Sequence, residues 1–303
     1  MNRRNFIGKT LTTSALFGAG SFPLQALAAG EMARLTILHT NDTHSRIEPF
    51  PAASKYPNMG GAATRATLVK KIRQEEKNVL LFDSGDIFQG TPYFNYFGGM
   101  LELEVMSKIG YDAATIGNHD FDGGIAGLLK QLPFANFPFL CANYDFAETE
   151  MAGKTKSYHV FEKNGIKTGV FGLGIELEGL VPPRLFGKTK YLEPIKAANK
   201  TAAKLKREHD CNLVVCLSHL GYKYDTSKVS DEVLAKSSED IDLILGGHTH
   251  TFFDAPVMMK NKKNHPVLIN QVGWAGIMLG RIDVVFDQTG RGKIFFSDSV
   301  KVF

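Results

Sequence analysis

The chain has 303 residues, of which 44% are hydrophobic and 22% are charged, and its formal net charge is +4 at pH 7. This composition excludes a disordered, collagen-like or coiled-coil protein and supplies enough apolar residues for a large core. The small, scattered charge favours neither nucleic acid nor an anionic membrane surface as a partner. The three cysteines, Cys141, Cys211 and Cys216, lie in apolar or extended runs and are expected to be buried, unpaired thiols.

Residues 1–28 are predicted to form a signal peptide. Arg3 and Arg4 precede a weakly apolar stretch, and the run Ala26-Leu27-Ala28 supplies the small residues typical of a cleavage site. The paired arginines resemble those of twin-arginine leaders, which export folded proteins. We therefore expect an exported, periplasmic or otherwise extracytoplasmic protein with no stable membrane span after cleavage. A leader that is kept as an anchor is the alternative, and the mature domain is expected to span residues 29–303.

From residue 34 onward, short apolar runs alternate with amphipathic runs, which is the pattern of successive βα units. Strands are expected at residues 35–38, 79–82, 113–116, 139–142, 158–162, 167–173, 213–217 and 242–245. Helices are expected at residues 60–77, 100–109, 124–131, 193–209 and 231–236. The last apolar runs, 267–270, 277–286 and 293–301, are predicted to form an antiparallel finish. The sequence therefore predicts one mixed α/β domain.

Residue types that bind metals follow five of these strands directly. The five segments are 39–44, 83–86, 117–122, 218–221 and 246–250, and they hold six of the nine histidines. Any one segment alone is explained by ordinary turn or capping chemistry, in which Asp and Asn are common. Open α/β sheets place their ligands at the carboxyl edge of the strands. Five such segments together therefore predict one site at this edge.

The residue types at this edge predict a pair of divalent metal ions. Carboxylates and imidazoles crowd together in a partly dry cleft only when a cation offsets their repulsion and desolvation. Nitrogen and oxygen ligands without thiolate suit Zn, Mn, Fe, Co or Ni, and the sequence does not distinguish between these metals. A single zinc ion needs about three protein ligands. This edge offers more, and two ions bridged by a shared carboxylate use the larger number naturally.

As an ordered set, the five segments resemble the motifs of the calcineurin-like binuclear metallophosphoesterases. More closely, they are similar to the catalytic domain of bacterial 5'-nucleotidases and UDP-sugar hydrolases. The motifs extend over nearly the whole mature chain and read Asn41-Asp42-Thr43-His44, Ser84-Gly85-Asp86, Gly117-Asn118-His119-Asp120-Phe121-Asp122, Ser218-His219 and Gly246-Gly247-His248-Thr249-His250. The resemblance implies a four-layer α-β-β-α sandwich with mixed sheets.

The resemblance also implies a role for each site residue by its position. The residues that would hold one metal are Asp42, His44 and His250, and those that would hold the other are Asn118, His219 and His248. Asp86 would bridge the two ions. His119 would form a catalytic dyad with Asp122, which orients its ring. The implied reaction is hydrolysis of small phosphate monoesters, 5'-nucleotides or related compounds, by a hydroxide held between the two ions.

The motifs specify the chemistry of the site but not the substrate. Two-domain nucleotidases bind the base with a C-terminal domain, and this chain stops at Phe303, where that domain would begin. Either a separate nucleotide-binding protein would supply base specificity, or the substrate is smaller or less selectively bound. A phosphodiesterase or sulfur-ester hydrolase is one alternative, and a metal-containing subunit that docks the missing domain is another. The aromatic residues at 88–97, Phe252 and Phe253 are interpreted as core packing rather than as a substrate wall.

Overall fold

The computed structural model describes residues 17–18 and 33–303. Most of the predicted signal peptide lies outside the described residues, including the cleavage point expected near Ala28. Within the part of the chain that is described, no helix is long and apolar enough to cross a membrane. All the predicted site residues lie in the described body of the chain.

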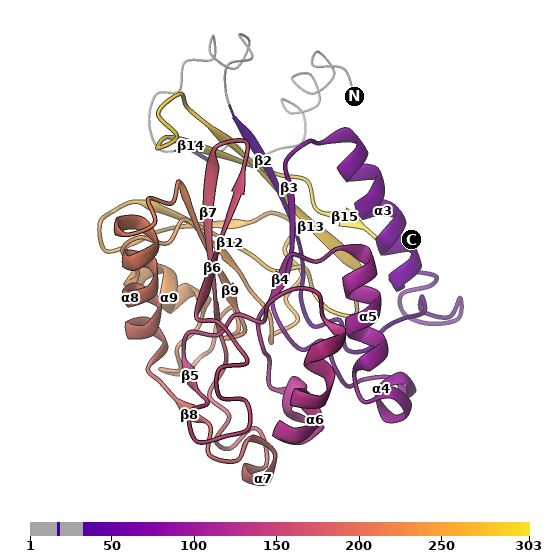
Figure 1. Ribbon diagram of the computed structural model, residues 1–303. Coiled ribbons are helices and arrows are strands. Elements are labelled where there is room, and N and C mark those ends of the chain that lie inside the picture. The colour runs from indigo at the N-terminus through magenta and orange to yellow at the C-terminus, as the bar shows by residue number, and fades with distance from the viewer. Residues whose placement is uncertain (1–16, 19–32) are drawn as a thin grey trace.

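Two mixed β-sheets form the centre of the fold (Figure 1). The first sheet has the order β1-β14-β13-β2-β3-β4, and β15 also pairs with β13. Its strands are β1 (Phe17–Gly18), β2 (Arg34–Thr40), β3 (Val79–Asp83), β4 (Ala113–Ala114), β13 (Met278–Phe286), β14 (Lys293–Ser297) and β15 (Val300–Lys301). The second sheet has the order β11-β12-β10-β9-β7-β6. Its strands are β6 (Tyr158–Lys163), β7 (Ile166–Leu173), β9 (Leu213–Ser218), β10 (Leu243–Leu245), β11 (Val257–Lys260) and β12 (Pro266–Asn270).

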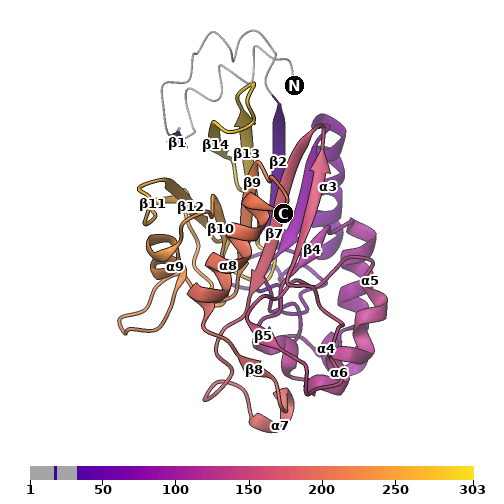
Figure 2. The same ribbon diagram turned by 60° about the vertical axis from the view of Figure 1, so that its left-hand side comes forward.

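Helices cover the outer faces of the two sheets (Figures 1 and 2). The first sheet is covered by α3 (Ala62–Glu75), α5 (Met100–Ile109) and α6 (Gly124–Gln131), and the second by α8 (Pro194–Arg207) and α9 (Asp231–Ser237). The shorter elements are α4 (Pro92–Phe97), α7 (Pro183–Phe186), the 3-10 turns His119–Phe121 and Leu132–Phe134, and a ribbon of β5 (Tyr144–Asp145) with β8 (Lys190–Tyr191). The predicted α-β-β-α sandwich with mixed sheets is confirmed.

The layers follow from the alternation of side chains along the strands. In β2, Leu35 and Ile37 point between the sheets, where they join Val215 and Leu217 of β9 in one buried cluster. The alternate residue Leu38 packs instead under the helices of the first sheet. Both faces of these strands are therefore buried, which explains why they read as continuous apolar runs rather than as alternating ones. All three cysteines are buried and unpaired, as predicted.

Local sequence signals fix several element ends. Asn164 and Gly165 both have positive φ, at 50° and 75°, as the tight turn between β6 and β7 requires. The helix α8 begins with a proline, and the Glu193 carboxylate before it accepts hydrogen bonds from the backbone N–H groups of Ile195 and Lys196 at 2.9 and 2.6 Å. A carboxylate at this position also faces the positive end of the helix dipole.

The strand predicted at residues 139–142 does not form. This segment passes from one sheet to the other: the N–H of Leu140 donates to Ala114 beside the first sheet, and that of Ala142 donates to Gly172 of β7 in the second sheet. Because Leu140 bonds to one sheet and Ala142 to the other, while Cys141 bonds to Lys156 outside both, only isolated bridges result. The strand predicted at 113–116 is also shorter than expected. Only Ala113 and Ala114 pair with β3, and these two residues form β4.

The expected antiparallel finish is only partly correct. β13 and β14 pair antiparallel, but β12 pairs in parallel with β10 and antiparallel only with β11, a strand that the sequence pattern does not reveal. The single strand expected at 293–301 breaks after Ser297, because the N–H of Asp298 donates to Arg281 and the chain then pairs again as β15.

The topology brings the carboxyl ends of several strands to one rim. β2, β3 and β4 run parallel in the first sheet, and β7, β9 and β10 run parallel in the second. The turns that follow β2, β3, β9 and β10, together with the segment after β4, carry the polar residues of the predicted site. The rim joins both sheets, so residues far apart in the sequence can meet there.

Candidate metal centre

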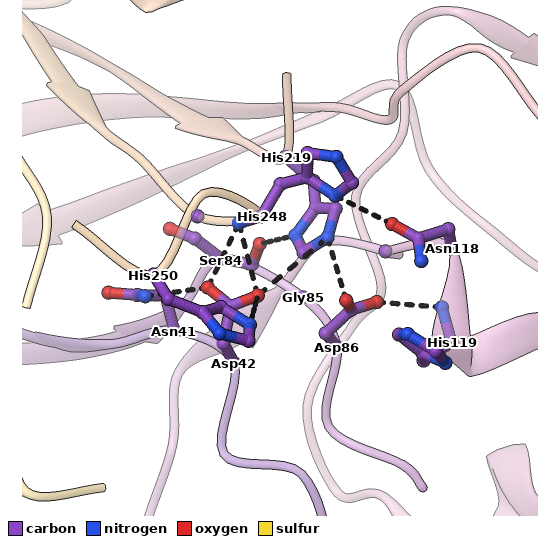
Figure 3. A network of polar contacts seen from close by, with 12 residues as sticks. Asn41, Asp42, Ser84, Gly85, Asp86, Asn118, His119, His219, His248 and His250 are labelled. Atoms are coloured by element: carbon purple, nitrogen blue, oxygen red, sulfur yellow. Dashed lines mark hydrogen bonds and ion pairs between the residues drawn. The ribbon is translucent and has the colours of Figure 1, made fainter. Parts of the chain in front are cut away.

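The seven predicted metal ligands converge at this rim. Figure 3 labels six of them, all except His44. Two groups offer one ligand atom per residue with all atoms of a group within 4.8 Å of one another: one is Asp42, His44 and His250, and the other is Asp86, His219 and His248. Asn118 lies beside the second group, with its Oδ1 atom 2.8 Å from Nδ1 of His248. The grouping differs from the expected one only in that Asp86 lies with His219 and His248.

Asp86 belongs to the second group and also faces the first. Its Oδ2 atom is 3.1 Å from Nε2 of His219 and 4.0 Å from Nε2 of His44, so the same oxygen faces a histidine of each group. In the other group, Oδ1 of Asp42 is 3.3 Å from Nε2 of His250. A carboxylate in the position of Asp86 can bridge two cations, which is the role that the family resemblance implies for it.

The backbone is strained at five of the predicted ligands. Positive φ values occur at Asp42, His44, Asp86, His248 and His250, between 48° and 70°. Residues other than glycine rarely adopt this conformation, and each instance costs on the order of 1–3 kcal/mol. A cluster of such residues around one point indicates that the surrounding fold holds the side chains in place for a function rather than for stability.

Backbone carbonyls orient the imidazole rings. Nδ1 of His219 donates to the Ser84 carbonyl at 2.7 Å, and Nδ1 of His44 lies 3.2 Å from the Gln89 carbonyl. With the proton on Nδ1, the lone pair of Nε2 points into the site, as metal ligation requires. Nε2 of His219 is fully buried and makes no well-aligned hydrogen bond. A buried nitrogen without such a partner fits a site that is built to hold a cation.

The pKa values of the centre follow from burial and from the two carboxylates. Burial lowers the pKa of His248 to about 4 and also lowers that of His44, which keeps both rings neutral and able to ligate. Burial opposes charge on His219 too, but Asp86 and Asp42 outweigh it and raise its pKa to about 10. Binding of a divalent cation would therefore compete with protonation of His219. Nitrogen and oxygen donors without thiolate, gathered in two groups, fit two divalent ions.

His119 and Asp122 lie beside the centre. Nδ1 of His119 is 2.8 Å from Oδ2 of Asp122, and this hydrogen bond raises the pKa of the imidazole. The His119 side chain is 43% exposed, and its ring lies 5.3 Å from that of His44. Its backbone N–H donates to Oδ1 of Asp86 at 2.7 Å. The predicted dyad thus contacts the candidate ligands, and the imidazole ring of His119 remains partly exposed to solvent.

Two supporting residues were given no role by the sequence reasoning. The Asn41 amide donates to Oδ2 of Asp42 at 2.6 Å and to the Gly273 carbonyl at 2.6 Å. The buried Asp120 carboxylate accepts from the N–H groups of Asp86, Ile87, Phe88 and Gly117. Both hold the turns that present ligands. Each is adjacent in sequence to a predicted site residue, Asn41 to Asp42 and Asp120 to His119, and this adjacency is the only sequence signal that points to it.

Two polar residues of the five segments have structural environments instead. His39 is fully buried between the sheets, where its Nε2 accepts from the Asn270 amide at 2.9 Å. Ser218 donates to the buried Asp231 carboxylate at 2.5 Å, and burial raises the pKa of Asp231 to about 8. Neither His39 nor Ser218 belongs to the two ligand groups.

Comparison with known proteins places this arrangement in a family. Residues 35–252 match the family model described as calcineurin-like phosphoesterase. The chain belongs to the calcineurin-like phosphoesterase family. This match confirms the family expected from the sequence. Calcineurin-like phosphoesterases are hydrolases that act on phosphate esters.

Curated relatives of this calcineurin-like phosphoesterase include 5'-nucleotidases. A 5'-nucleotidase of Vibrio vulnificus is 33% identical over 99% of this chain and 58% of its own length. A snake venom 5'-nucleotidase of Gloydius brevicauda is 33% identical over 88% of this chain and 47% of its own length. The chain spans about half the length of these two relatives.

Solved structures show the same fold. A 5'-nucleotidase precursor from Thermus thermophilus superposes with a TM-score of 0.80 at 30% identity, over 89% of this chain and 55% of that one. The calcineurin-like phosphoesterase YfkN from Bacillus subtilis gives a TM-score of 0.74 at 25% identity, over 89% of this chain and 91% of that one.

Proposed function

We propose that this protein is an exported, metal-dependent phosphoesterase that hydrolyses phosphate monoesters, with 5'-nucleotides as its principal substrates. The observation that carries the proposal is the meeting of two nitrogen and oxygen ligand groups at Asp86, which faces a histidine of each, next to the hydrogen-bonded pair of His119 and Asp122. The names of its relatives support nucleotides as substrates.

The proposed ligands give the centre its charge balance. Asp42 and Asp86 contribute two buried carboxylates, while four histidines and Asn118 would contribute neutral donors once a cation replaces the proton of His219. Bound divalent ions would lower the pKa of water toward neutrality and offset charge on the phosphoryl oxygens. The Asn118 side-chain amide, which lies beside His248, can donate a hydrogen bond to a phosphoryl oxygen from its NH₂ group.

We assign proton transfer to His119. Asp122 accepts from Nδ1–H and thereby fixes the ring, which leaves Nε2 to carry the second proton. Because this hydrogen bond raises the pKa of His119, the protonated ring persists at higher pH and can donate to the leaving oxygen of the alcohol. General acid catalysis of this kind contributes about 10²–10⁴-fold to the rate.

A panel of three substrates tests the function. The purified protein, supplied with Mn²⁺ or Zn²⁺, is assayed with AMP, p-nitrophenyl phosphate and bis-p-nitrophenyl phosphate, while its metal content is measured by elemental analysis. We expect both monoesters to be hydrolysed and the diester to react far more slowly. Preference for the diester would make the protein a phosphodiesterase. Inactivity on all three with two metals bound would favour a subunit that docks a separate nucleotide-binding protein.

Export is proposed from the leader alone. The paired arginines Arg3 and Arg4, with the small residues near Ala28, support translocation of the folded, metal-loaded protein. Cell fractionation of the wild type should place the protein outside the cytoplasm. The double variant Arg3→Lys, Arg4→Lys keeps the charge and should retain the protein in the cytoplasm. Equal export of both would contradict the twin-arginine assignment.

A further inference from the structure

Four aromatic rings gather beside the candidate metal centre, and the proposed reaction does not use them. Phe50, Tyr56, Phe252 and Trp274 come from three separate segments of the chain. The ring centroid of Trp274 lies 5.7 Å from that of Phe50 and 6.5 Å from that of Tyr56, which in turn lies 6.3 Å from Phe252. We call these four residues the aromatic shelf.

The aromatic shelf begins at a predicted metal ligand. The indole of Trp274 stacks on the His250 ring with a centroid distance of 5.7 Å and an interplanar angle of 8°. A group bound against Trp274 is therefore separated from the predicted ligand His250 only by the indole ring. This places the shelf within reach of the alcohol part of an ester whose phosphate is at the metals.

Hydrogen bonds fix the shelf relative to the ligands. Asn41 bonds to both Val272 and Gly273, at 3.0 and 2.6 Å, and the N–H of Ala275 donates to the Asp42 carbonyl at 2.7 Å. Trp274 is thus held on both sides by the segment that presents Asp42. A rigid platform next to a reacting centre favours binding, because little conformational entropy is lost when a ligand binds to it.

The shelf is not a piece of the core. Phe252 is 40% exposed, and the other three rings are only partly buried, whereas the rings of the hydrophobic core are closed off almost completely. The interpretation of Phe252 as core packing is therefore wrong. Clustered, exposed aromatic rings that border a polar site are a feature of ligand-binding surfaces.

Cations lie over two of the four rings of the shelf. The Arg46 guanidinium lies 4.2 Å above the centre of the Phe50 ring, and the Lys55 ammonium lies 5.2 Å above that of Tyr56. These charges attract an anionic ester toward the shelf. The rings supply a stacking surface, and the cations attract the anionic ester toward the site as a whole. The combination suits a phosphate ester whose alcohol part carries a planar ring.

We propose that the aromatic shelf binds a planar ring in the alcohol part of the substrate, such as a nucleobase, and so makes this chain selective for ring-bearing phosphate monoesters. The inference rests on the proposed function and extends it, because it assigns ring recognition to residues of this chain itself. Phe50, Tyr56, Phe252 and Trp274 are specificity residues in this view, and they take no part in bond cleavage.

Two variants that leave the ring beside His250 intact test the inference. For Tyr56→Ala and Phe252→Ala, we expect kcat/KM for AMP to fall about five- to tenfold, mainly through KM, because each removes part of a base-stacking surface. The same variants should leave ribose 5-phosphate, which lacks the base, within about twofold of the wild type. Tyr56→Phe keeps the ring and should behave as the wild type. Tyr96→Ala removes a ring that is 83% exposed outside the shelf and serves as the matched control.

Binding supplies a readout that does not depend on turnover. Trp274 is the one tryptophan of the sequence, so its fluorescence reports directly on the shelf. In the metal-loaded protein carrying His119→Asn, AMP should quench this fluorescence more strongly than ribose 5-phosphate does, and Tyr56→Ala should raise the Kd for AMP. Equal effects on both ligands, or no effect of the shelf variants on either, would overturn the inference. A wild type that binds AMP in this way but hydrolyses no ester would refute the proposed function and leave the shelf standing.

Discussion

The buried histidine His39 makes the stability of the protein depend on pH in a way that the structure specifies. Its side chain is fully buried between the sheets, and burial lowers its pKa from 6.5 to about 3. The folded protein therefore keeps His39 neutral, while the unfolded chain takes up a proton below pH 6.5. Stability from the neutral ring is complete above that pH and is lost as the pH falls from 6.5 toward 3.

The size of the effect can be worked out at one pH. At about pH 5, the pH is 1.5 units below the pKa of His39 in the unfolded chain, while His39 in the folded protein is still unprotonated. Protonation of the unfolded chain therefore lowers the free energy of unfolding by about 2 kcal/mol. The result is insensitive to the folded pKa, provided that it lies below about 4, because the folded histidine is then uncharged at pH 5. This is a large share of the stability of an ordinary domain.

The assay compares urea unfolding of the metal-free wild type with that of His39→Gln at about pH 8 and pH 5. The glutamine does not titrate, and its side-chain carbonyl can still accept from Asn270. Other titrating groups affect both proteins alike, so they cancel in the difference. We expect the wild type to lose about 2 kcal/mol more than the variant between the two pH values. His39→Asn, which fills the space differently, should show the same flattening, and parallel losses in all three proteins would refute the reasoning.

Three further predictions concern the site and the sheet that supports it. His119→Asn and, separately, Asp122→Asn should lower kcat by about 10²–10⁴-fold with metal content unchanged by elemental analysis; wild-type turnover would remove the dyad from the mechanism. Asp86→Ala should lose metal and activity together, and full activity with two metals retained would exclude its bridging role. Burial opposes charge on Asp242, but Lys206 and Lys293 together with the hydrogen bonds to this carboxyl outweigh it and lower its pKa. Asp242→Asn should therefore cost about 1–3 kcal/mol in urea unfolding near pH 7. That cost should shrink as the pH falls below the ordinary carboxyl range, and a cost independent of pH would contradict the ion pair.

The order of strands and helices was predictable because buried strands read as apolar runs and the helices between them keep one apolar face. The rim was predictable for a related reason: parallel strands bring the turns at their carboxyl ends to one edge, so Asp42 and His219 could be expected to meet across 177 positions of sequence. The failures lie where the backbone pairs irregularly. Residues 139–142 are apolar enough for a strand, but they bond to both sheets in turn, and no periodicity encodes that path.

The aromatic shelf was missed for a different reason. Phe50, Tyr56 and Trp274 carry no shared motif, and their proximity arises only when the loops fold around the ligand segment. Aromatic residues in a sequence are most often core residues, so composition alone favours packing. Exposure and stacking on His250, which are properties of the fold, are what distinguish the shelf from the core.

Anomalous diffraction from crystals of the protein loaded with Mn²⁺ tests most directly whether this rim holds two divalent ions. We expect two peaks in the difference map, one among Asp42, His44 and His250 and the other among Asp86, His219 and His248, with the Asp86 carboxylate contacting both. A map with a single peak, or with peaks only outside these groups, would contradict the two-metal centre and the hydrolytic function proposed from it.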